Sequence, residues 1–215
     1  MKVLRMVPIQ KLRQSYSSRA RGLFTPMTAA IGRSGITPNQ LTVLGLLLAI
    51  AVAFLVWYGY FFIAAVVFAV GGLMDMLDGA VARLSEKVTP LGAFIDSTFD
   101  RLGEGIVLTS IALFYAREGD LWVVGATFAT LIGSFLVSYT RARAEALGRE
   151  CKVGLMTRAE RLVLLGIGLA LQRFGVLAVV MYILSVLTAV TVLQRILHVR
   201  RQFLELEAQK KQTGP

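Results

Sequence analysis

Hydrophobic residues in this chain occur in long runs that short polar stretches separate. Six runs predict helices across a hydrocarbon core of roughly 30 Å. They cover residues 40–59, 60–82, 92–116, 121–140, 160–172 with its flanks, and 176–198. The fifth run is the shortest and begins among charged residues, so five or seven spans are also compatible with the pattern. The predicted fold class is all-α: a polytopic membrane protein with six transmembrane helices.

The composition supports this prediction and excludes an ordinary soluble domain. The 215 residues are 56% hydrophobic and only 17% charged, and their mean hydropathy is +0.67. Soluble domains carry about 25% charged residues. The apolar runs therefore belong in a membrane.

Basic residues predict how the chain is oriented. They gather before the first span, after the second, and between the fourth and fifth, whereas the opposite loops, residues 58–61, 117–120 and 172–175, hold only Arg117 and Arg173. The positive-inside rule then places both termini, and the loop between the second and third spans, on the cytoplasmic side of the cell membrane. This topology, together with attraction to anionic lipid, explains much of the net charge of +10, so we expect no nucleic-acid partner.

The two ends of the chain read as parts of one domain, residues 1–215. Residues 1–38 interleave apolar with basic residues and never sustain the apolar core of a signal peptide. They predict an interfacial amphipathic helix in the cytoplasmic headgroup layer, although a disordered basic tail over residues 1–15 is an alternative. Residues 199–215 predict a polar cytoplasmic tail.

Four acidic residues stand inside the predicted second and third helices. Asp75 and Asp78 are three residues apart and Asp96 and Asp100 are four apart, so each pair shares one helix face. Each acid costs about 2.5 to 3.5 kcal/mol near the centre of a membrane helix, which requires compensation. Hard divalent cations prefer such oxygen ligands. We predict two of them, with Mg²⁺ expected and Mn²⁺ equally compatible with the ligands.

These acids have two alternative explanations, a buried ion network and an ion-coupled transporter. A buried ion network with Arg83 and Arg101 would pair at most two of the four carboxylates. An ion-coupled transporter also places acids in the membrane, but the chain shows neither inverted repeats nor matched broken helices.

The acids belong to a longer pattern, D-x2-D-G-x2-A-R-x8-G-x3-D-x3-D. It is filled by Asp75, Asp78, Gly79, Ala82, Arg83, Gly92, Asp96 and Asp100. This pattern resembles the signature of the CDP-alcohol phosphatidyltransferase family, and the segment GITPNQLT, residues 35–42, resembles the entry to that family's first helix. The resemblance implies an enzyme that transfers a phosphatidyl group from CDP-diacylglycerol to an alcohol and releases CMP.

The resemblance also implies roles for individual residues. Asp100 is the expected general base. The expected metal ligands are Asp75, Asp78, Asp96 and Asp100. The expected nucleotide and CDP-lipid contacts are Asn39, Asp75, Asp78, Gly79, Ala82, Arg83 and Thr89. A homodimer is expected from the resemblance alone.

Arginines outside the signature indicate a phosphorylated acceptor. The expected acceptor-phosphate residues are Arg141, Arg143, Arg161 and Arg195, since guanidinium groups bind phosphate in a bidentate manner. Arg195 lies inside an apolar run, where it needs an anionic partner unless it reaches the nearby interface. Within the family, the SYTRARAE, ERL and QR segments look closest to bacterial phosphatidylinositol phosphate synthases, with Arg141 where a lysine is expected. Inositol 1-phosphate is therefore the predicted acceptor, and glycerol 3-phosphate is the alternative.

Overall fold

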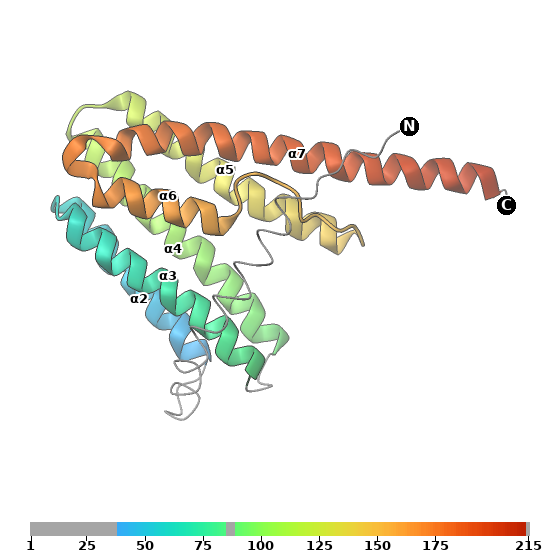
Figure 1. Ribbon diagram of the computed structural model, residues 1–215, viewed down its shortest axis with the longest axis horizontal. Coiled ribbons are helices and arrows are strands. Elements are labelled where there is room, and N and C mark those ends of the chain that lie inside the picture. Colours follow the sequence, from blue (N-terminus) through green and yellow to red (C-terminus); the bar gives the residue numbers. More distant parts are fainter. Residues whose placement is uncertain (1–37, 85–88, 214–215) are drawn as a thin grey trace, which may run out of the picture.

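The computed structural model describes residues 38–84 and 89–213, with side chains over residues 39–75 and 89–209. Within these ranges the chain is all-helical (Figure 1). The α-helices are α2 (Pro38–Trp57), α3 (Phe61–Leu84), α4 (Pro90–Arg117), α5 (Leu121–Ala146), α6 (Arg158–Ala170) and α7 (Val176–Thr213). Each overlaps one of the six hydrophobic runs. The interfacial helix expected in residues 1–38 lies almost wholly outside the described residues.

Local capping fixes where the site helices begin. The side chain of Thr89 accepts a hydrogen bond from the backbone N–H of Gly92, and Pro90 occupies the first turn of α4. The backbone N–H of Thr157 donates to the Glu160 carboxylate at the start of α6. As a result Arg158 and Arg161 lie in the first turn of α6.

Helix α7 does not end where its apolar run stops, near residue 198. It continues to Thr213, and Figure 1 shows it projecting beyond the other helices. The polar segment beyond residue 198 is rich in Arg, Gln, Leu, Glu, Ala and Lys, which are good helix formers, so the helix persists after the apolar residues end. The predicted tail is therefore helical over residues 199–213.

The principal contacts between helices form a closed ring. Helix α2 packs against α3 and α4, α4 against α5, α5 against α7, α7 against α6, and α6 against α3. The buried core runs through this ring. Its largest fully buried apolar side chains are Val52, Val56, Val107, Leu108, Ile111, Val123, Leu169, Leu177, Met181 and Leu184. Side chains that point inward can thus reach helices that are not adjacent in the ring.

The outside of the ring is strongly apolar. Large side chains such as Phe54, Phe62, Val163 and Val186 are between 61% and 70% exposed. Within the described residues, three helical stretches are long and apolar enough to cross a membrane, namely Asn39–Trp57, Leu121–Ala146 and Val176–Gln209. An apolar exterior on this scale is typical of an integral membrane protein.

Candidate active site

Three of the four predicted acids converge where α3 meets α4. Asp75 comes from α3, while Asp96 and Asp100 lie one turn apart on α4. One carboxylate oxygen of each lies within 4.8 Å of the others, and all three side chains are partly buried. The fourth acid, Asp78, follows Asp75 by one turn on α3, but its side chain lies outside the described residues. The expected convergence of the two helices is confirmed for three residues.

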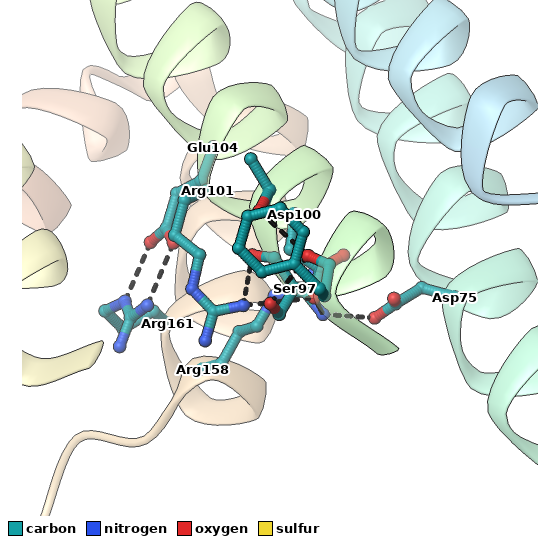
Figure 2. A network of polar contacts seen from close by, with 9 residues as sticks. Asp75, Ser97, Asp100, Arg101, Glu104, Arg158 and Arg161 are labelled. Atoms are coloured by element: carbon teal, nitrogen blue, oxygen red, sulfur yellow. Dashed lines mark hydrogen bonds and ion pairs between the residues drawn. The ribbon is translucent and has the colours of Figure 1, made fainter. Parts of the chain in front are cut away.

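Arg158 forms the closest ion pairs with this cluster. Its Nη1 atom lies 2.5 Å from Oδ2 of Asp75 and 2.8 Å from Oδ2 of Asp100. Figure 2 shows the guanidinium between these two residues, which belong to α3 and α4. Arg101 is more distant, with Nη1 3.8 Å from Oδ2 of Asp100, and its side chain is 38% exposed. The cluster is therefore bridged chiefly by an arginine of α6.

The donor set fits a divalent cation. The three carboxylates carry more negative charge than Arg158 and the distant Arg101 supply. Oδ1 of Asp96 is buried and makes no hydrogen bond within the described part of the chain. An octahedral Mg²⁺ with oxygens at 2.0–2.1 Å holds those oxygens about 3 to 4 Å apart, close to the observed grouping. A cavity beside the cluster is lined by Asp75, Asp96 and Asp100, together with apolar residues of α2 and α3.

Asn39 and Thr89 both lie close to Gly92, one turn before Asp96 on α4. A Cβ atom built on Gly92 would lie 3.0 Å from the Thr89 hydroxyl and 3.4 Å from Oδ1 of Asn39. Glycine at position 92 therefore lets the N-terminal ends of α2 and α4 approach closely. The other predicted nucleotide contacts on α3, namely Gly79, Ala82 and Arg83, have side chains outside the described residues.

Arg161 points into the ring and meets an acid that the sequence analysis did not single out. Its Nε and Nη2 atoms donate to the two carboxylate oxygens of Glu104, at 2.7 and 2.9 Å. Both residues are buried, with 2% of Arg161 and 7% of Glu104 exposed. The pair joins α6 to α4 across the ring.

Arg195 is buried, and its side chain makes its hydrogen bonds with the backbone. Within the described residues its guanidinium donates to two backbone carbonyls, that of Val153 at 3.0 Å and that of Val137. It thereby joins α7 to α5 and to the loop between α5 and α6. Arg141 and Arg161 lie within electrostatic range of it. Arg141 itself pairs with Glu145 on the exposed side of α5, and Arg143 is exposed.

The loop between α5 and α6 is held against α7 at several points. The side chain of Thr191 accepts a hydrogen bond from the backbone N–H of Met156 at 3.0 Å, and the side chain of Gln194 accepts one from Leu155 at 3.2 Å. Gln202 donates to the carbonyl of Glu150. Because this loop leads directly into α6, these contacts help to place Arg158 and Arg161.

Comparisons with known proteins agree with the site. Residues 35–201 match the family model for CDP-alcohol phosphatidyltransferase. An archaetidylinositol phosphate synthase of Pyrococcus horikoshii is 37% identical over 169 residues, which cover 78% of this chain and 86% of that protein. A phosphatidylinositol phosphate synthase of Streptomyces avermitilis is 39% identical over 199 residues, covering 86% of this chain and 81% of that protein. The chain therefore belongs to the CDP-alcohol phosphatidyltransferase family, and it is an enzyme.

Solved structures extend this similarity to the fold. The crystal structure of Mycobacterium tuberculosis phosphatidylinositol phosphate synthase with CDP-DAG bound is 36% identical, has a TM-score of 0.76, and covers 81% of this chain and 92% of its own. A second structure of that enzyme, in complex with manganese and citrate, has the same TM-score and identity. The transporter alternative is accordingly set aside, and the three-acid cluster is supported as a divalent-metal site.

Proposed function

We propose that this protein transfers the phosphatidyl group of CDP-diacylglycerol to inositol 1-phosphate, giving phosphatidylinositol phosphate and CMP. The observation that carries the proposal is the arrangement inside the ring: a cluster of carboxylates suited to cations lies beside Arg158 and Arg161, which α6 supplies. Cations held by the cluster would bind a diphosphate, and the arginines suit a phosphate on the acceptor. The names of the relatives support inositol phosphate rather than glycerol 3-phosphate.

The proposed ligand set assigns the site residues to three groups. Asp75, Asp78, Asp96 and Asp100 hold two divalent cations, for which Mg²⁺ is our choice. Asn39, Gly79, Ala82, Arg83 and Thr89 contact the cytidine diphosphate, together with Asp75 and Asp78. Arg141, Arg143, Arg161 and Arg195 receive the phosphate of the acceptor. We also assign Arg158 to the site, because its ion pairs bridge Asp75 and Asp100.

The chemistry then depends on one proton transfer. Asp100 accepts the proton of the acceptor hydroxyl, and the hydroxyl oxygen forms a bond to the phosphorus that carries diacylglycerol. The bond from that phosphorus to the oxygen of CMP breaks, and CMP leaves with the electron pair. When bound, the cations grip the diphosphate and neutralise charge at the attacked phosphorus. Arg158 holds Asp75 and Asp100 in register across the α3 and α4 helices.

The proposed setting is the cytoplasmic membrane, with residues 1–215 as one domain. All six helices cross or line the bilayer, and an interfacial helix in residues 1–38 precedes them. Exposed aromatic side chains at one end of the bundle support this placement, because Tyr58, Tyr60 and Trp122 are 58% to 83% exposed where an aromatic belt is expected. Both termini and the site face the cytoplasm. We further propose a homodimer, on the resemblance alone, with each site complete within one chain.

The test is CMP release by purified protein in detergent with CDP-diacylglycerol and Mg²⁺. Inositol 1-phosphate, glycerol 3-phosphate, inositol and serine are offered separately, and an EDTA sample serves as the control. We expect release with inositol 1-phosphate only, and none with EDTA. Release with glycerol 3-phosphate instead would replace the acceptor but keep the reaction, whereas release with free inositol would remove the role of the arginines.

A further inference from the structure

Glu104 has no part in the reaction as described so far, yet it lies one turn beyond Asp100 on α4. Asp96, Asp100 and Glu104 follow one another at intervals of four residues and share a helix face. Glu104 also lines the cavity that the three cluster carboxylates line. It is therefore part of the same chamber, although Arg158 forms its ion pairs with Asp75 and Asp100 rather than with Glu104 (Figure 2).

The contact between Glu104 and Arg161 uses only one edge of the guanidinium. The two carboxylate oxygens accept from Nε and Nη2, which fixes the plane of the group. The Nη1 atom is buried and makes no hydrogen bond within the residues that the structure describes. A buried donor without a partner costs roughly 1 to 3 kcal/mol, so its retention calls for an explanation.

Stability alone is a weak explanation for this pair. Buried ion pairs are often no more stabilising than apolar residues of similar volume, because the desolvation of both charges offsets their attraction. The ring already has an apolar core around α4 and α6 that includes Leu108 and Leu165. The pair does fix the orientation of the Arg161 guanidinium, and it leaves the Nη1 donor available.

We propose that Glu104 is a positioning residue for the acceptor: it holds Arg161 so that Nη1 donates to the phosphate of the incoming alcohol. This inference rests on the proposed function, since it assumes a phosphorylated acceptor. Because Glu104 neutralises Arg161, the phosphate is recognised by a directed hydrogen bond more than by free positive charge. The pair thereby favours an acceptor whose phosphate lies at one defined position.

The test is a double-mutant cycle on the purified full chain. CMP release is measured while the concentration of each substrate is varied in turn. Glu104→Gln should raise the KM for inositol 1-phosphate about 10-fold or more, as expected for a lost charge-assisted contact, and change the KM for CDP-diacylglycerol less than about 2-fold. Arg161→Gln should do the same to a greater extent. The double variant should match Arg161→Gln alone, because Glu104 acts through Arg161.

Matched variants separate positioning from a structural role. Ser110→Ala removes a buried hydroxyl of α4 that donates only to the backbone of Val107, and its kinetics should equal those of the unmodified enzyme. Glu104→Asp keeps the charge on a shorter side chain and should give an intermediate KM for the acceptor. Effects that add in the double variant, equal rises in both KM values, or failure of both Glu104 variants to fold would each overturn the inference. A wild-type enzyme that releases no CMP with any phosphorylated acceptor would instead refute the proposed function.

Discussion

Removing the Arg158 side chain should destabilise the protein in a way that divalent cations reverse. Arg158→Gln deletes two ion pairs, to Asp75 at 2.5 Å and to Asp100 at 2.8 Å, whose side chains are 15% to 32% exposed. A hydrogen bond between charged groups contributes roughly 1.5 to 3 kcal/mol, and partial exposure reduces this, so we expect a loss of about 2 to 4 kcal/mol for the two together. In a chain of this size, that corresponds to a fall in Tm of about 5 to 10 °C.

The assay is thermal unfolding in detergent, with EDTA and with Mg²⁺. In EDTA the variant has three carboxylates close together without their main counter-charge, so the full fall in Tm should appear. A cation at about 100 times its Kd stabilises the folded state by about 2.7 kcal/mol, and it should bind the more negative site of the variant more tightly. Mg²⁺ should therefore raise the Tm of Arg158→Gln more than that of the unmodified protein.

Arg101→Gln is the matched control for this experiment. Its guanidinium lies 3.8 Å from Asp100 and is 38% exposed, so its removal should cost less than about 1 kcal/mol. Equal losses in the two variants would show that proximity to Asp100, rather than the bridge to Asp75, matters. An unchanged Tm for Arg158→Gln in EDTA would refute the reasoning altogether.

Three further predictions concern catalysis and packing. Asp100→Asn should leave nucleotide binding largely intact and lower transfer by a factor of about 10² to 10⁴, which CMP release and CDP-lipid binding would check; normal turnover would remove the base assignment. Arg195→Gln should raise the KM of the acceptor far more than that of CDP-diacylglycerol, and an unchanged acceptor KM would leave Arg195 with a purely structural role. Gly133→Ala would place a Cβ against both the hydroxyl and the Cβ of Thr188, so it should cost about 1 to 3 kcal/mol in thermal unfolding. Thr188→Gly in the same chain removes both clashing atoms and should recover part of that loss, whereas no recovery would point to a different clash.

The helices could be predicted because their signal is local. Each helix begins within two residues of its predicted start, but α5 and α7 continue beyond their apolar runs, since their polar continuations have helix-forming residues but no apolar pattern. The carboxylate cluster could also be predicted from local spacing. Asp96 and Asp100 are four residues apart, a spacing that indicates one shared helix face, and Asp75 lies on the preceding helix.

The partners of these acids could not be deduced in the same way. Arg158 lies 83 residues after Asp75, and Arg161 lies 57 residues after Glu104. No short stretch of sequence indicates which helices lie next to one another in the ring. One signal was present, because Glu104 continues the four-residue spacing of Asp96 and Asp100 and could have marked a third inward-facing acid.

Arg195 shows a different limit. A cation inside an apolar helix predicts an anionic partner, but within the described residues the Arg195 guanidinium donates to two backbone carbonyls, which the pattern does not predict. Carbonyl oxygens belong to every residue and leave no trace in a sequence pattern. The nucleotide contacts expected at Gly79, Ala82 and Arg83 stay predictions.

The closed ring has a consequence for biosynthesis. In the six-span arrangement that we propose, α3 and α4 enter the bilayer before α6 is translated. The arginines that pair with Asp75, Asp100 and Glu104 are therefore synthesised 57 to 83 residues after these acids. A lone acid at the centre of a membrane helix costs about 2.5 to 3.5 kcal/mol. The insertion of α3 and α4 is therefore less favourable until α6 is present. A nascent chain that stops before Arg158 would therefore leave Asp75 and Glu104 without the ion pairs that they make with α6 in the full fold.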